Sequence, residues 1–197
     1  MYYEIHITVL TDDVIQFKLD CEKIGVKPIV IETQNKDKFE YQVMTSSKYK
    51  AIVNVEQEYG FKADEITNKL LNKGYKIIRQ KVEKSPDKIK SPNFIYYESH
   101  LRLKIPKSDL TLLEIVAKVC NEYNFHLSKN IFKSDDEFIY QMITYRNYNQ
   151  EYYDFINHVV NAKSFLDYSN IFCDKVETEE AIFDSNIHVD NNWLNNE

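Results

Sequence analysis

The sequence predicts an α+β fold of two tandem ferredoxin-like (βαββαβ) repeats, related by a pseudo-two-fold axis and packed as one compact unit. Two observations lead to this fold class. The 197 residues contain an internal duplication, and both copies alternate strand-type and helix-type hydrophobic periodicity in the same order. A composition of 43% apolar and 28% charged residues is typical of a folded protein with its own core.

The duplication consists of three matched blocks in the same order. They are YYEIHITV and YYESHLRL from residues 2 and 96, FEYQVMT and FIYQMIT from residues 39 and 138, and KVE from residues 81 and 175. The copies are 94 residues apart in the first and third blocks and 99 apart in the second. A longer loop around Pro106 accounts for the difference, because loops absorb insertions without changing the elements they connect.

The first copy begins with a strand over residues 2–9, in which Ile5, Ile7 and Val9 alternate with polar residues. Apolar residues at helical spacing over 14–24 then predict a helix that Gly25 ends. The elements expected to follow are strands at 26–32 and 39–46, a helix at 63–73 closed by Gly74, and a strand at 75–83.

The second copy repeats this order. Its opening strand over 96–103 precedes a helix with an apolar stripe that includes Val116 and Cys120. Cys120 takes the place that Cys21 has in the first copy, which predicts that both cysteines are packing residues. The later elements are strands at 124–132, 137–146 and 171–177 and a helix at 151–166.

These elements divide the chain into four segments. They are repeat 1 over 1–83, a proline-containing linker over 84–93, repeat 2 over 94–177 and a tail over 178–197. Two prolines make the linker stiff. In the tail, Ala181, Ile182 and Phe183 predict an added edge strand, and a turn is expected directly after them.

Strand alternation predicts which side chains the helices leave uncovered. In a ferredoxin-like unit two helices cover one face of the sheet, so the apolar residues of the opening strands point to the helices. Two uncovered faces in one chain are expected to meet around a shared groove, where we place the candidate site. The uncovered faces carry Glu4, His6 and Thr8 in repeat 1 and Glu98, His100 and Arg102 in repeat 2.

Composition argues against several function classes. No apolar run approaches the roughly 20 residues that span a bilayer, so no membrane partner is expected. The N-terminus lacks the basic and apolar segments of a secretory signal peptide, which predicts a cytoplasmic location. Three widely separated cysteines fit a reducing compartment. A net charge of −6 argues against non-specific DNA binding. Oligomeric state has no signal in the sequence.

His6 and Thr8 share the open face of their strand, where an imidazole can move a proton while a hydroxyl orients a phosphate oxygen. The pattern resembles the two-histidine phosphoesterase superfamily, which carries an H-x-T or H-x-S motif in each of two pseudo-symmetric lobes. The resemblance implies cleavage of a phosphate ester without metal or cofactor, with His6 as general base and His100 as general acid. In that family a strand and a helix precede the first motif, whereas five residues precede it here.

Arg102 stands where that family has a hydroxyl residue. Arginine recognises phosphate through a planar fork of donors. We therefore expect Thr8, Arg102 and Arg146 to hold the phosphate of a small molecule or nucleotide, with Thr45 and Thr144 beside them on the third strand of each repeat. The facing of that third strand stays open, because both of its faces carry polar residues.

Two other functions fit the same residues. The segment from His6 to Pro28 also resembles the opening of a vicinal-oxygen-chelate module, although that module has no helix before its fourth strand. This likeness implies a divalent transition metal held by His6, Glu83, His100 and Glu177. The third candidate is a non-enzymatic groove that binds a nucleotide, a short RNA or a peptide. The whole chain also resembles a family of tandem-repeat proteins with no assigned activity, which adds no functional expectation.

Overall fold

The computed structural model of the protein describes residues 2–35, 38–51, 55–133 and 135–190. The first half of the chain forms β1 (Tyr2–Leu10), α1 (Val14–Ile24), β2 (Lys27–Asn35), β3 (Lys38–Lys50), α2 (Val55–Leu71) and β4 (Lys76–Lys84). The second half forms β5 (Tyr96–Pro106), α3 (Leu112–Glu122), β6 (His126–Asn130), β7 (Phe138–Asn147), α4 (Tyr152–Tyr168) and β8 (Phe172–Asp184), followed by the short 3-10 helix η1 (Ile187–Asp190). No helix in these ranges is long and apolar enough to cross a membrane.

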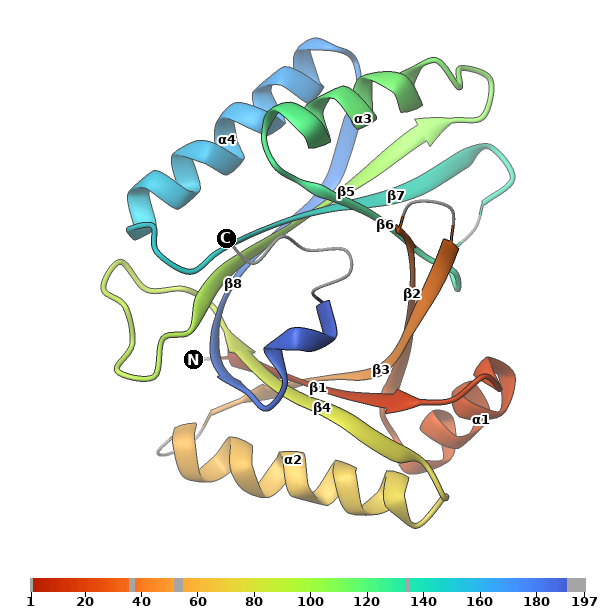
Figure 1. The fold of residues 1–197 in the computed structure, drawn as a ribbon, viewed down its shortest axis with the longest axis vertical. Helices are drawn as coiled ribbons and strands as arrows, with labels where there is room; N and C mark the ends of the chain where they lie inside the picture. Colours follow the sequence, from red (N-terminus) through yellow and green to blue (C-terminus); the bar gives the residue numbers. More distant parts are fainter. Residues whose placement is uncertain (1, 36–37, 52–54, 134, 191–197) are drawn as a thin grey trace.

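The strands of the described chain close into one antiparallel barrel. Their neighbour order is β1-β3-β2-β6-β7-β5-β8-β4, and β4 pairs again with β1. Two joints connect the halves, because β2 pairs with β6 and β4 pairs with β8. Figure 1 shows the barrel nearly end-on, with α1 and α2 outside one half and α3 and α4 outside the other.

The prediction of the fold class is therefore wrong. Each half does run β-α-β-β-α-β, but the two sheets are continuous and do not face each other as plain repeats across a groove. A separate sheet would leave a row of unpaired backbone N–H and C=O groups along each edge strand. Pairing the edges of one half with those of the other satisfies these groups and turns the expected groove into the inside of a barrel.

The hydrophobic cores lie between the barrel wall and the helices. Ile5, Ile7 and Val9 of β1 are at most 3% exposed and belong to the core of the first half. A second core is built in the same way between β5, β7, α3 and α4. Cys21 and Cys120 are buried in these cores, as expected of packing residues. Because the apolar side chains point outward to the helices, the alternate residues of each strand point into the barrel.

β8 is longer than the sequence predicted and forms one of the two joints. It continues beyond the expected end at Glu177 and includes the three residues that were expected as a separate edge strand. Its last part pairs with β4, where Ala181 lies opposite Glu83. The segment assigned to the tail therefore supplies part of the barrel wall.

Candidate functional site

The barrel encloses a cavity of about 190 Å³ that is lined by both charged and apolar side chains, room for on the order of ten water molecules or a small organic ligand. Side chains from all eight strands line it. The chain has three arginines, and all of them, Arg79, Arg102 and Arg146, lie on this lining. In a lysine-rich chain, arginine at these positions indicates a need for a planar fork of donors.

The structure places most of the predicted site residues on the cavity lining. Alternation along β1 and β5 directs their polar residues inward, while Ile5, Ile7 and Leu101 are fully buried on the outer side. The predicted residues on the lining are His6, Thr8, His100, Arg102, Thr144, Arg146 and Glu177.

Thr45 does not line the cavity, and its predicted role in holding phosphate is therefore not supported by its position. Its hydroxyl accepts a hydrogen bond from the backbone N–H of Ile7 at 3.2 Å. The matched sequence blocks align Thr45 with Thr144, but the strand registers align Ser46 with Thr144. A shift of one residue along a strand moves a side chain to the opposite face.

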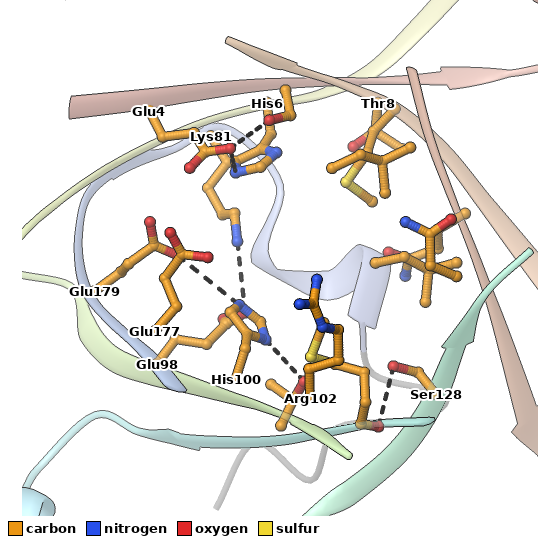
Figure 2. Close-up of a pocket in the computed structure, with 18 of the residues that line it drawn as sticks. Glu4, His6, Thr8, Lys81, Glu98, His100, Arg102, Ser128, Glu177 and Glu179 are labelled. Carbon is orange, nitrogen blue, oxygen red and sulfur yellow. Dashed lines mark hydrogen bonds and ion pairs between the residues drawn. The ribbon is translucent and has the colours of Figure 1, made fainter. Parts of the chain in front are cut away.

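Glu83, Lys81 and Glu98 connect the two histidines. Figure 2 shows His6, Lys81, Glu98 and His100 of this network. Nε2 of His6 lies 3.1 Å from Oε2 of Glu83. Nζ of Lys81 lies 2.7 Å from Oε1 of Glu83 and 3.5 Å from Oε1 of Glu98, and Nε2 of His100 lies 3.1 Å from the same Glu98 oxygen. Lys81 thus joins carboxylates from the two halves of the chain.

These charges depend on one another. Burial alone would raise the pKa of Glu83, but the charge of Lys81 and the contact with His6 lower it to about 2. For Glu98, Arg146 and Lys81 outweigh the effect of burial and hold the pKa well below its usual value. Burial works against a charged Lys81, yet the two carboxylates raise its pKa. The middle of the network is therefore ionised at neutral pH.

Both ring nitrogens of His6 face acceptors. Nδ1 lies 3.2 Å from the backbone carbonyl oxygen of Thr45, and Nε2 faces carboxylates of Glu83 and Glu4 at 3.1 and 3.6 Å. A carbonyl oxygen only accepts, so Nδ1 is the donor in the contact with Thr45. The ring of His6 is thus held between a carbonyl oxygen and two carboxylates.

His100 has a different second partner. Its Nδ1 lies 2.9 Å from Oγ1 of Thr144, a hydroxyl that either donates or accepts. Its Nε2 faces Glu98, which requires a proton on that nitrogen. Thr144 and Glu98 thus hold the ring of His100 through its two nitrogens.

The four residues of the alternative metal site do not converge. His6 contacts Glu83, whereas His100 contacts Glu98, and Glu177 is ion-paired with two lysines. The structure therefore gives no support to a metal held jointly by His6, Glu83, His100 and Glu177.

Within the described ranges, one group of carboxylates is close enough to share a cation. It consists of Glu4, Glu177 and Glu179, whose ligand atoms lie within 4.8 Å of one another. Nζ of Lys48 already contacts Glu4 at 2.8 Å and also contacts Glu177. Burial, followed by repulsion from Glu83, Glu4 and Glu177, raises the pKa of Glu179 to about 9. The ammonium group of Lys48 and a proton on Glu179 thus compensate the negative charge of this carboxylate group.

One end of the barrel is closed by η1, which lies across the space enclosed by the strands (Figure 1). Asp190 is 1% exposed and accepts hydrogen bonds from Nη1 of Arg79 at 2.7 Å, Nη2 of Arg146 at 2.7 Å and Nε2 of Gln42 at 2.8 Å. Burial would raise the pKa of Asp190, but Arg146 and Arg79 lower it. This arrangement is termed the closed end.

The opposite end is open and carries a group of cations that we term the cationic mouth. It consists of Lys27, Arg102, Lys133 and Lys175. The side chains of Arg102, Lys133 and Lys175 are 28%, 33% and 45% exposed. At the closed end, by contrast, the arginine side chains are 2% and 3% exposed.

Carboxylates neutralise part of this group of cations, because Lys175 is ion-paired with Glu177 and Arg102 with Asp174. Asp174 accepts from Nε and Nη2 of Arg102 at 2.7 and 2.8 Å. The same carboxylate is 4.0 Å from Nζ of Lys133. Burial, followed by repulsion from Arg102, lowers the pKa of Lys133. An added anion would relieve this repulsion.

Sequence reasoning missed several residues of the site. Glu83 was predicted only as a metal ligand beside His6. Lys81 lies two residues before it on the same face of the strand, in a matched block, and was not assigned to the site. Lys133 and Asp190 lie outside the strands, where no periodicity predicts the direction of a side chain.

Comparisons with known proteins leave the function open. No family model and no curated protein matches the sequence. Solved structures align over most of the chain, at low similarity. A putative monooxygenase from Fusobacterium nucleatum has 11% identity and a TM-score of 0.35, and the alignment covers 93% of this chain and 92% of the other. A putative monooxygenase from Lactobacillus acidophilus has 13% identity, a TM-score of 0.32 and 92% coverage of both chains. An unknown protein from Galdieria sulphuraria has 10% identity, a TM-score of 0.28 and coverages of 91% and 97%. At TM-scores this low, these likenesses support no inference about this chain.

Proposed function

We propose that the barrel binds a small phosphate-bearing molecule, whose phosphate lies at the cationic mouth and whose remaining part extends into the cavity. The observation that carries this proposal is the incompletely neutralised group of cations at the open end, in a chain whose net charge is −6. Localised positive charge at the entrance of a cavity attracts anions and raises their local concentration.

Arg102 is suited to anchor the phosphate. Asp174 fixes the guanidinium through Nε and Nη2, which leaves Nη1 as the donor that this carboxylate does not use. A guanidinium held in place loses little conformational entropy when it binds an oxyanion. Lys133 and Lys175 add point charges from the same end of the cavity.

Binding fits the histidines better than hydrolysis does. A general base needs a nitrogen without a proton, and both nitrogens of His6 face acceptors. Contacts with Glu83 and Glu98 hold the two rings to the barrel wall, so we assign His6 and His100 to the shape and polarity of the cavity. Turnover of cyclic AMP that is lost in the His6→Ala/His100→Ala double variant would contradict this assignment and favour the metal-free esterase.

Calorimetric titration with inorganic phosphate and adenosine monophosphate tests the binding proposal. Replacing Arg102 or Lys133 by Gln is expected to weaken binding roughly ten- to a hundredfold, because a hydrogen bond to a charged group contributes about 1.5–3 kcal/mol. Lys163→Gln is the matched control. Its ammonium pairs with Asp167 on the outer face of α4, 2.6 Å away, and its loss should leave affinity unchanged. The proposal fails if neither probe binds, or if the control weakens binding equally.

A further inference from the structure

At the closed end, donors from several strands converge on one carboxylate, while Asp184 and Glu98 also accept from Arg79 and Arg146. Side chains from three different strands, Gln42 of β3, Arg79 of β4 and Arg146 of β7, donate to the single carboxylate of Asp190. Two guanidinium groups converge on the same oxygen, Oδ2, each at 2.7 Å. Charge-assisted bonds of this kind are the main way in which proteins recognise carboxylate and phosphate groups.

Asp190 does not use all of the donors that this site offers. Nη1 of Arg146 is buried and has no hydrogen-bond partner within the ranges that the structure describes. The side chain of Arg146 is 2% exposed, lines the cavity and lies with its guanidinium carbon 4.2 Å from the centroid of the Tyr96 ring. A buried donor without a partner is costly, so its presence points to a larger acceptor than a carboxylate.

Apart from this carboxylate, the hydrogen bonds that hold the segment carrying Asp190 are mostly long. Nε2 of Gln42 donates to the carbonyl oxygen of Val189 at 3.4 Å. Of the four residues of η1, Asp190 alone is buried. Before η1, the side-chain amide of Asn186 donates to the carbonyl oxygen of Ile78 at 3.1 Å. Within the segment, the amide of Val189 donates to Asn186 O at 3.3 Å. A short segment with few buried contacts opens at low free-energy cost.

We propose that Gln42, Arg79 and Arg146 form a second oxyanion-binding site, which Asp190 fills in this structure and which a phosphate group fills when η1 leaves. A phosphate has more acceptor oxygens than a carboxylate and satisfies Nη1 of Arg146 in addition to the donors that Asp190 uses. The ligand class is therefore a phosphate monoester or inorganic phosphate, in preference to a carboxylate. The chain's own aspartate acts as a competing ligand that closes this end of the barrel.

This site goes beyond the binding proposed at the cationic mouth and does not depend on it. The two sites share no residue, because the mouth uses Arg102 and Lys133 whereas the closed end uses Arg79 and Arg146. Variants at one site therefore report on that site alone.

Calorimetry on Asp190→Ala in the full chain tests the proposal. Removal of the competing carboxylate should create a phosphate site, or tighten phosphate binding at least tenfold, while acetate binds more weakly than phosphate. Asp167→Ala on α4 removes the same charge from the outer surface and is the control that should show no gain. Equal phosphate affinity in a folded Asp190→Ala variant and in the wild type overturns the proposal.

Two double variants show which of the two sites is responsible for the gain in phosphate affinity. Arg146→Gln combined with Asp190→Ala should abolish it, whereas Arg102→Gln combined with Asp190→Ala should preserve it. If the gain survives loss of Arg146 and disappears with Arg102, the new binding belongs to the mouth and the closed-end site does not exist.

Hydrogen exchange on the wild-type chain keeps the proposal testable if Asp190→Ala fails to fold. Phosphate should displace the aspartate, so the amide of Val189 should exchange faster in phosphate than in sodium chloride of equal ionic strength. Exchange that is unchanged at saturating phosphate shows that Asp190 is a structural clamp only.

Discussion

At the residue scale, the barrel is defined by charges that are buried together. Lys81, Glu83 and Glu98 are each at most 7% exposed, and each has its partner within the same network. Removing one member of such a network leaves another charge without compensation, which is far more costly than the intact pair is stabilising. The network therefore fixes the arrangement of the cavity more than it adds to stability.

Replacement of Lys81 by Met tests this dependence. The substitution leaves two buried carboxylates without their shared ammonium group, and we expect a loss of about 3–5 kcal/mol in the free energy of unfolding. Lys163→Met removes an exposed lysine from α4 and should change it by less than about 1 kcal/mol. Urea denaturation measures both, and similar small losses in the two variants would show that the network is not coupled.

Glu179 makes a prediction about pH. Its pKa is raised from 4.5 in the unfolded chain to about 9 in the fold, so the folded state holds one more proton between these values. This contribution to stability is fully present below pH 4.5 and is lost as the pH rises toward about 9. Glu179→Gln, which is neutral at every pH, should lose less stability than the wild type between pH 5 and 9. Parallel pH profiles of the melting temperature would contradict the assigned protonation.

At the element scale, the sequence predicts the order of strands and helices well because hydrophobic periodicity is a local property. Register and closure are not local. The FEYQVMT and FIYQMIT blocks align Thr45 with Thr144 in the sequence. In the strand registers, Ser46 takes the position that corresponds to Thr144, a shift of one residue. Polar and apolar residues alternate along β1 and β5 in the same way whether the sheet is open or closed into a barrel. Hence the sequence could predict that His6 and His100 point away from the helices. It could not predict the closed barrel, its cationic mouth or the contacts of Asp190.

The joint between β4 and β8 is the element on which closure depends. Ala181 is fully buried and lies opposite Glu83 on one side and Tyr96 on the other. Ala181→Pro should destabilise the fold by about 3 kcal/mol or more, because a proline in a central strand removes a ladder hydrogen bond. Ala181→Gly keeps the backbone donor and should cost about 1 kcal/mol. Chemical denaturation compares the two, and equal losses would show that the joint adds little.

At the scale of the whole molecule, the two halves form a barrel whose ends differ. Both halves have the same order of elements, but η1 closes one end with a carboxylate while the other end exposes Arg102, Lys133 and Lys175. The chain thus shows at one end how an acidic group is bound by inward-facing arginines. At the other end Arg102 and Lys175 have carboxylate partners, whereas Lys133 comes no closer than 4.0 Å to Asp174. This asymmetry is the basis for placing the ligand at the cationic mouth.

The most direct measurement is a crystal structure of the protein soaked in tungstate, a tetrahedral oxyanion that anomalous scattering identifies without ambiguity. We predict tungstate inside the mouth, within hydrogen-bond distance of the Arg102 guanidinium and beside Lys133. Tungstate bound solely to lysines on the outer surface, with the mouth containing only water, would contradict the proposal that the barrel binds phosphate.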